Sequence, residues 1–195
     1  MGRGRLEAFS DAVFAVIITI MVLDIKVPHG DTWDDLLPLL PIFLSYVLSF
    51  VFIGIYWNNH HHLLHVCDTV TGGMLWANLH LLFWLSLLPF ATGWMGENHF
   101  STLPIVLYGA VLLLAGVAYN LLQLTIIRAQ GPNSLLKHAV GRDWKGKLSV
   151  VMCLAAIIAS LRVPWLAEAI FVALALLWLI PDRRIEHVLR SRNAG

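Results

Sequence analysis

The chain has 195 residues and a formal net charge of +1; 58% of its residues are hydrophobic and only 13% are charged. Soluble domains carry about a quarter charged residues, so this chain has more apolar surface than one water-soluble core can bury. The composition therefore predicts an integral membrane protein. The sequence contains no Gly-rich phosphate loop, nucleophile elbow or nucleic-acid-binding module, and we expect neither an enzyme nor a nucleic-acid partner.

Apolar runs of the length needed to cross a bilayer, about 20 residues, recur along the chain. They cover residues 6–26, 36–66, 74–94, 103–127, 148–161 and 165–180. The last two are short and are separated only by residues 162–164, so a re-entrant hairpin is the alternative to two full spans there. We predict an all-α polytopic membrane protein in which residues 1–195 form a single domain of six transmembrane helices.

The first apolar run also resembles a cleaved signal peptide, because Arg3 and Arg5 precede it. Asp11 lies early in this run, however, and no small-x-small cleavage site follows before Asp24. We therefore expect the run to be retained as the first helix.

The distribution of charge predicts the orientation in the membrane. With a cytoplasmic N-terminus, eleven of the 13 Lys and Arg residues fall on the cytoplasmic side, and only Lys26 and Arg162 lie outside. This agrees with the positive-inside rule and requires an even number of spans, so we expect the C-terminus to be cytoplasmic too. The outer segments are acidic by comparison, which fits either ordinary solvated loops or a negative mouth that concentrates cations. Their acidic residues are Asp24, Asp31, Asp34, Asp35 and Glu97.

Polar residues from three predicted helices are expected at one depth, near the cytoplasmic face. Asp11 lies inside the first span, where an ionised side chain costs roughly 2.5–3.5 kcal/mol and needs a partner. Arg5 is within two turns of Asp11, and Ser10 also points toward neighbouring helices. The end of the second run and the start of the third supply the other polar residues: Trp57, Asn58, Asn59, His60, His61, His62, His65, Asn78 and His80.

A second face of the first helix carries a mainly apolar stripe. At 100° per residue, Val16, Thr19, Ile20 and Leu23 lie on one side of the helix. Helix packing, lipid contact and the lining of a pore all account for such a stripe. Its spacing alone leaves these alternatives open.

The histidines allow a different interpretation. His61 and His65 are four residues apart, which places two ligands on one helix face, and Asp68 follows closely. A zinc or haem site is therefore the alternative to a polar network. The sequence has no second histidine pair with matching spacing, and Cys67 is not part of a CxxC motif.

The run Arg5-x-x-x-Phe9-Ser10-Asp11 resembles the signature of the transmembrane protein 175 family, which are potassium-permeable channels. The rest of the first helix is similar as well, as are Trp57-x-x-His60 and Asn78-Leu79. The segment Leu88-Pro89-Phe90 extends this similarity. The resemblance covers residues 5 to about 92, and the remainder matches in hydrophobic pattern and spacing.

The resemblance implies a homotetramer in the prokaryotic plasma membrane, with four first helices around a central pore. In the family's pattern, Val16 is the inner hydrophobic constriction, Leu23 is an outer one, and Ile20 is close to the same face. Thr19 is the hydroxyl linked to potassium preference, with K⁺ passing near it and no resident metal or cofactor. The polar network that braces the pore helix then consists of Arg5, Phe9, Ser10, Asp11, Trp57, His60 and Asn78.

The chain has no TVGYG-type filter, so selectivity cannot come from a cage of backbone carbonyls. We expect passive conduction of monovalent cations with a modest preference for potassium, lipids being the surrounding partner. The alternatives are a proton-coupled secondary transporter that uses Asp11, and a histidine-ligated metal or haem protein.

Overall fold

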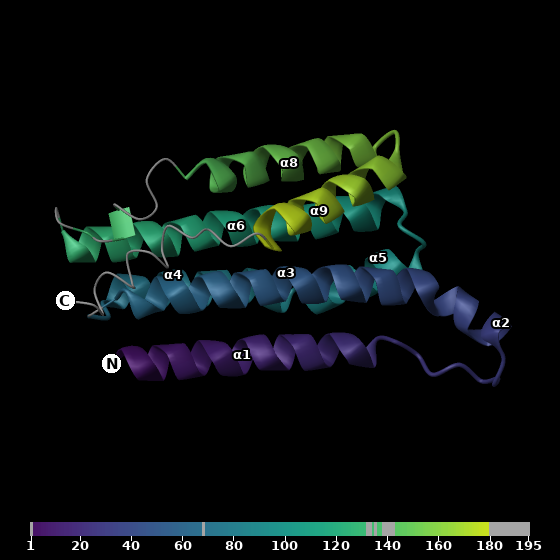
Figure 1. Cartoon of the computed structure of the whole chain (residues 1–195), viewed down its shortest axis with the longest axis horizontal. Helices are drawn as coiled ribbons and strands as arrows, with labels where there is room; N and C mark the ends of the chain where they lie inside the picture. Colours follow the sequence, from purple (N-terminus) through teal and green to yellow (C-terminus); the bar gives the residue numbers. More distant parts are fainter. Residues whose placement is uncertain (1, 68, 132–133, 135, 138–142, 180–195) are drawn as a thin grey trace.

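The computed structural model describes residues 2–67, 69–131, 134, 136–137 and 143–179, and its regular structure within these ranges is entirely helical (Figure 1). The elements are α1 (Arg3–Leu23), α2 (Trp33–Leu36), the 3₁₀ turn η1 (Leu37–Leu39), α3 (Leu40–His65), α4 (Gly72–Ser86), α5 (Leu88–Glu97), α6 (Thr102–Gln130), α8 (Trp144–Ser160) and α9 (Pro164–Leu179).

Four helical segments in the described part of the chain are long and apolar enough to cross a membrane. They are Arg3–Leu23, Trp33–His65, Gly72–Glu97 and Thr102–Gln130. Helices α8 and α9 have 17 and 16 residues, which at 1.5 Å per residue is about 25 Å, somewhat less than the roughly 30 Å hydrocarbon core. The all-helical prediction is confirmed, while the count of six spans stays a prediction.

Proline residues account for the breaks within two of these segments. Pro89 lies in the first turn of α5, where its missing N–H and its ring prevent α4 from continuing without a kink. Pro38 in η1 and Pro41 at the start of α3 act in the same way on the second segment. The predicted run 74–94 is therefore two consecutive helices, α4 and α5, in place of one.

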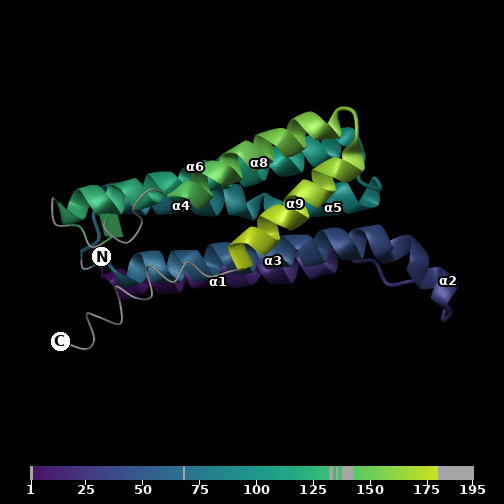
Figure 2. The ribbon, with the colours of Figure 1, turned by 45° about the horizontal axis from the view of Figure 1, so that its top comes forward.

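The helices lie roughly parallel or antiparallel in a bundle with α1 along one edge (Figures 1 and 2). Helix α1 packs against α3, α4 and α5, whereas α8 and α9 pack on α6 and on each other. The face that α1 turns inward has the spacing of a helix-packing seam: Leu6, Ser10, Phe14, Ile17 and Met21 are buried.

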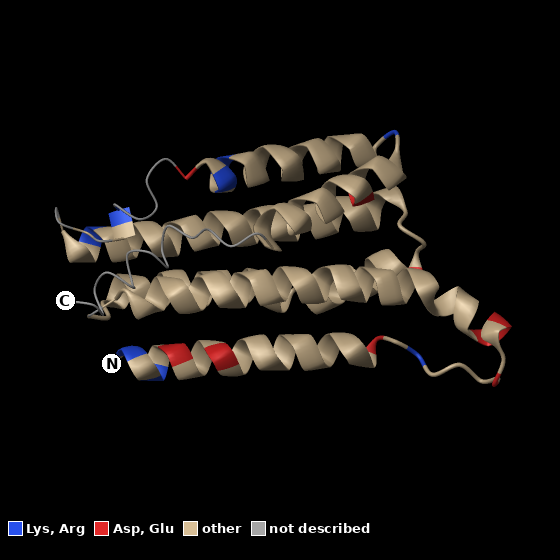
Figure 3. Ribbon diagram, viewed as in Figure 1, with Lys and Arg blue, Asp and Glu red and all other residues tan. Residues whose placement is uncertain are grey.

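Charged residues divide between the two ends of the bundle (Figure 3). Most of the described Lys and Arg residues lie at the start of α1, around the end of α6 and at the start of α8, at one end, whereas Lys26 and Arg162 lie at the other. Acidic residues gather in the connection between α1 and α3 at the other end, while Glu7 and Asp11 lie within α1. The basic residues expected at the C-terminus, Arg183, Arg184, Arg190 and Arg192, and Arg142 lie outside the described residues.

Candidate functional site

Helix α1 has an outward face that no other part of the described chain covers. Val16, Ile20 and Leu23 are 53%, 46% and 77% exposed, although all three are large and apolar. Thr19 lies between them and is exposed too. The predicted stripe therefore faces away from the rest of the described chain, which excludes packing against those residues as its explanation.

The hydroxyl of Thr19 is oriented by its own helix. Its Oγ1 lies 3.0 Å from both the Ala15 and the Val16 carbonyl oxygens, to which it donates its proton. Because the proton points back to the backbone, the oxygen lone pairs are left on the exposed side. This is the orientation in which a hydroxyl can coordinate a cation.

The inward face of α1 is held by a buried chain of hydrogen bonds. Asn78 Nδ2 donates to Ser10 Oγ at 3.0 Å, and Ser10 donates to the Leu6 carbonyl at 2.9 Å. Since the Asn78 amide nitrogen is used in this way, its Oδ1 must accept from His60 Nε2, 2.7 Å away. Ser10, His60 and Asn78 are all 0% exposed, so three predicted network residues meet in the core.

This series of hydrogen bonds determines the tautomer of His60. The ring must carry its proton on Nε2, so Nδ1 is an acceptor, and it is buried without a partner in the described part of the chain. The Phe14 ring packs against the imidazole, with a centroid separation of 5.5 Å. A proton added at Nδ1 would have no acceptor there, so the network is built around a neutral histidine.

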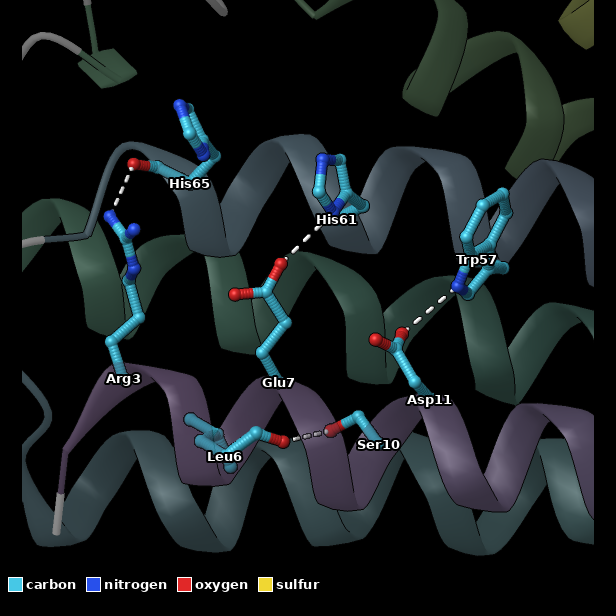
Figure 4. Close-up of polar contacts among 8 residues, drawn as sticks. All are labelled: Arg3, Leu6, Glu7, Ser10, Asp11, Trp57, His61 and His65. Atoms are coloured by element: carbon cyan, nitrogen blue, oxygen red, sulfur yellow. Dashed lines mark hydrogen bonds and ion pairs between the residues drawn. The ribbon is translucent and has the colours of Figure 1, made fainter.

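A second set of contacts joins α1 to α3 along the rim of the same interface (Figure 4). The Asp11 carboxylate accepts from Trp57 Nε1 at 2.9 Å, and Glu7 lies 3.0 Å from His61 Nδ1. Arg3 donates to the backbone carbonyl of His65 at 3.0 Å. The three contacts are one turn apart on each helix, because the helices run antiparallel and residues four apart share a face.

Two predicted members of the network lie elsewhere. Arg5 is exposed and forms no side-chain hydrogen bond or ion pair within the described ranges, and Phe9 is 47% exposed. Both lie outside the hydrogen bonds described above, and their role stays a prediction. Sequence reasoning missed Arg3 and Glu7, although the four-residue spacing of Glu7 and Asp11 matches that of Trp57 and His61.

The histidines at the end of α3 are distributed among separate contacts. His61 pairs with Glu7 and stacks on His65, with ring centroids 6.0 Å apart. No group of three or more His, Cys, Asp or Glu side chains suited to a metal ion occurs among the described residues. Asp68, the third member of the metal alternative, lies outside them.

A small charged cluster lies just after the C-terminal end of α1. Lys26 Nζ lies 2.7 Å from Glu97, and this hydrogen bond raises the pKa of Lys26. Burial, and then the charge of Glu97, raises the pKa of Asp24 above its ordinary value of 3.8. Asp24 also lies against Gly93 of α5, where an added Cβ would be 3.2 Å from its carboxylate oxygen.

These features describe a helical membrane protein with an apolar edge helix that packs against its neighbours on one side and is exposed on the other. The profile of the family described as "Endosomal/lysosomal potassium channel TMEM175" matches residues 5–89. A potassium channel of Chryseobacterium sp. (strain P1-3) is 51% identical over 191 residues, which are 98% of this chain and 100% of that protein. The chain belongs to the TMEM175 family.

A solved structure gives the same fold. The crystal structure of a lysosomal potassium-selective channel TMEM175 homolog from Chamaesiphon minutus superposes with a TM-score of 0.81 at 27% identity, covering 92% of this chain and 97% of that one. The endosomal/lysosomal proton channel TMEM175 of Gallus gallus is 35% identical over 103 residues. That alignment covers 47% of this chain and only 21% of the longer vertebrate protein.

Proposed function

We propose that this protein is a passive, potassium-permeable cation channel, formed by four identical subunits around a central pore lined by α1. Family membership and a relative that is named a potassium channel over its whole length support the activity. The observation that carries the proposal is the outward face of α1, because Val16, Ile20 and Leu23 need either lipid or further copies of the chain to cover them.

In this proposal, Val16 and Leu23 form two apolar constrictions with Ile20 between them. Rings of apolar side chains gate a narrow pore by excluding water when they close. Thr19 supplies the only polar side chain of the stripe, and its back-bonded hydroxyl leaves an oxygen free for a partly dehydrated potassium ion. Four such oxygens replace only part of a hydration shell, so the preference for potassium over sodium is modest.

The braced face of α1 gives the pore helix its position. The Ser10–Asn78–His60 chain and the Asp11–Trp57 bond tie it to α4 and α3. Arg5 and Phe9, which project from the subunit, are available for contacts with a neighbouring subunit. The network therefore acts on assembly and pore shape, with no direct contact to the ion.

The membrane arrangement completes the proposal. Residues 1–195 form one domain that crosses the membrane six times, with α8 and α9 as the last two spans and both termini in the cytoplasm. The basic end of the bundle supports this orientation. The bacterial source of the 51% identical relative supports a prokaryotic plasma membrane.

Two alternatives use the same residues differently. A proton-coupled transporter would use Asp11 as its carboxylate, yet Asp11 is engaged by the Trp57 indole at the rim of the α1–α3 interface. Because the Gallus gallus relative is named a proton channel, proton flux should be measured beside potassium flux. A haem or zinc protein would need the His61 and His65 pair, whose first member pairs with Glu7.

Ion flux in liposomes tests the proposal. Purified protein in vesicles with a potassium gradient should conduct in the presence of a protonophore that keeps the proton gradient at zero. Sodium-loaded vesicles of the same preparation should conduct more slowly. Flux that vanishes when the proton gradient is removed would indicate the transporter, and visible absorbance or bound zinc in the purified protein would indicate the histidine site.

A further inference from the structure

A cavity of about 110 Å³ lies within the subunit, on the side of α3 that faces away from α1. Helices α3, α6, α8 and α9 enclose it. Its deeper walls are apolar and aromatic, with Phe52, Leu112 and Leu174 among them, while Asn59, Asn120, Gln123 and Asp143 contribute polar side chains. Small-molecule sites have this composition, an apolar enclosure with a few polar groups that set the orientation of the ligand.

The two asparagine side chains in this cavity are oriented by hydrogen bonds to their own helices. Asn59 Nδ2 donates to the Ile55 carbonyl at 2.8 Å, and Asn120 Nδ2 donates to the Gly116 carbonyl at 2.9 Å. Because a carbonyl only accepts hydrogen bonds, each amide can be oriented in only one way. Each amide therefore keeps its oxygen Oδ1 and one N–H for a further partner.

The two tyrosine hydroxyls of the lining also donate their protons to backbone carbonyls. Tyr56 donates to the Leu112 carbonyl and Tyr119 to the Asn59 carbonyl, both at 3.3 Å. These two hydroxyls keep only acceptor capacity toward the cavity.

The contact between Ser149 and Trp178 follows the same rule. The Trp178 indole donates to Ser149 Oγ at 2.8 Å, and Ser149 donates to the Lys145 carbonyl at 2.8 Å. Both donors are therefore used within the protein, and neither is available to a ligand.

One carboxylate and one unpartnered amide remain. Asp143 is the N-cap of α8, and its Oδ1 accepts from Gly146 N at 3.1 Å, which leaves Oδ2 without a bond within the described ranges. Gln123 is only 8% exposed, lines the cavity and forms no side-chain hydrogen bond to another described residue.

From these contacts we infer that the cavity is a binding site for a small protonated amine with an apolar body. The ammonium group supplies donors and a positive charge to the acceptors of the lining, facing the Asp143 carboxylate and the amide oxygens of Asn59, Asn120 and Gln123. The apolar body lies against Phe52 and Leu112. An anion would meet a carboxylate and acceptors, and an uncharged hydrocarbon would leave these acceptors unpaired.

The aromatic walls favour the same ligand. Ammonium groups are attracted to the faces of Trp and Tyr rings. The Nζ of Lys145 already lies 5.7 Å from the centroid of the Trp178 ring, so the faces left for a ligand are those of the tyrosines. The rings of Tyr56 and Tyr119, which pack edge to face with centroids 6.3 Å apart, offer further aromatic surface.

The volume limits the size of the ligand. An engineered apolar cavity of about 150 Å³ binds benzene, so a cavity of about 110 Å³ accepts a body no larger than one ring. Benzylammonium is a suitable probe, and benzyl alcohol is its uncharged counterpart with the same number of heavy atoms.

The test is a titration of the purified, detergent-solubilised protein with each probe at constant potassium concentration, followed by ligand-observed NMR. Benzylammonium should bind at least tenfold more tightly than benzyl alcohol. Asp143→Asn keeps the helix cap but removes the charge, and it should weaken amine binding roughly 10- to 100-fold. Asp31→Asn, at an exposed carboxylate outside the cavity, should leave amine binding unchanged.

A blocking variant locates the site. A Cβ at Gly116 would meet only Tyr56 Oη, at 3.7 Å, so Gly116→Leu directs a side chain into the cavity and should abolish binding of the amine. Binding that survives Gly116→Leu would place the amine elsewhere, the pore included, and would overturn the inference. Equal affinity for amine and alcohol, or no amine binding by the unaltered protein, would overturn it as well, even if Asp143→Asn failed to fold.

Discussion

At the scale of single residues, Asn78 is the side chain on which the position of α1 depends most. It accepts from His60 and donates to Ser10, so it satisfies two buried partners on two other helices at once. Water cannot replace either bond without entering the core. The contact therefore stabilises the protein mainly because these buried groups would cost free energy if they were left without partners.

Replacing Asn78 with Leu should destabilise the protein by about 1–3 kcal/mol, because Ser10 and His60 would keep buried polar atoms without partners. Thermal unfolding in detergent measures this. Asn98→Ala is the matched control: Asn98 is exposed and donates only to Trp94 of its own helix, so its loss should cost less than about 0.5 kcal/mol. Equal losses in the two variants would refute a bracing role for Asn78.

Asp11 offers a separate test of bracing against ion contact. Asp11→Ala removes the acceptor of the Trp57 indole and should lower the yield of assembled protein without changing the potassium-to-sodium flux ratio. Asp11→Asn keeps an acceptor and should assemble better than the alanine variant. Size-exclusion chromatography and liposome flux measure the two effects. A well-assembled Asp11→Ala protein with altered selectivity would move the carboxylate to the ion path.

At the scale of elements, α3 and α5 pack closely against each other, and this packing determines how the helices behind α1 are spaced. A Cβ on Gly96 would come within 2.6 Å of Ser45 Oγ and 2.7 Å of the Ile42 Cα atom. Side chains can rotate away from such a clash, but a backbone atom cannot, so the two helices pack at this distance only because residue 96 is glycine.

Gly96→Ala should therefore separate α3 from α5 and lower stability by about 1–3 kcal/mol. Gly54→Ala in α3 is the control, since nothing lies within 4 Å of its added Cβ. Alanine favours helix over glycine by up to about 1 kcal/mol, so the control should be neutral or stabilising. Comparing the melting temperatures of both variants decides this, and an unchanged melting temperature for Gly96→Ala would contradict the close packing.

The sequence predicted most helices because each is a long apolar run with few charges. It did not predict the split between α4 and α5, although Pro89 was visible, because whether a proline bends or ends a helix depends on the tertiary packing around it. The pairing of Arg3 and Glu7 with α3 was missed for a related reason. Which face of α1 meets which residue of α3 depends on the rotation of both helices, and this is set by the buried side chains of Phe14 and Ile17.

The core of the site was better predicted than its rim. Ser10, His60 and Asn78 are polar residues in apolar helices, where they need partners, and the family resemblance singled them out among the polar residues expected at this depth. Arg5 can reach solvent or another chain, so no such requirement defines its partner. That Val16 and Leu23 share one face followed from helical spacing, whereas the exposure of this face is seen only in the structure and its function in a pore rests on the family.

At the scale of the whole molecule, the proposed six spans require that the connection between α1 and α3 and the start of α8 lie on opposite sides of the membrane. Single cysteines at Asp34 and Lys147, both exposed, should react with an impermeant thiol reagent from outside and inside, respectively. The native Cys67 and Cys153 are buried and are replaced in the background. Labelling of both positions from the same side would contradict the topology and, with it, the arrangement of the pore.

The central claim is that Thr19 and Leu23 line a fourfold pore. The most direct test is the potassium-to-sodium flux ratio of Leu23→Ala and Thr19→Val in the same liposomes. Leu23→Ala widens an apolar ring, so leak should rise and discrimination should fall. Thr19→Val keeps the shape but removes the hydroxyls, so the potassium preference should fall without a matching rise in leak. A flux ratio unchanged from the unaltered protein in both variants would contradict the assignment of α1 as the pore helix.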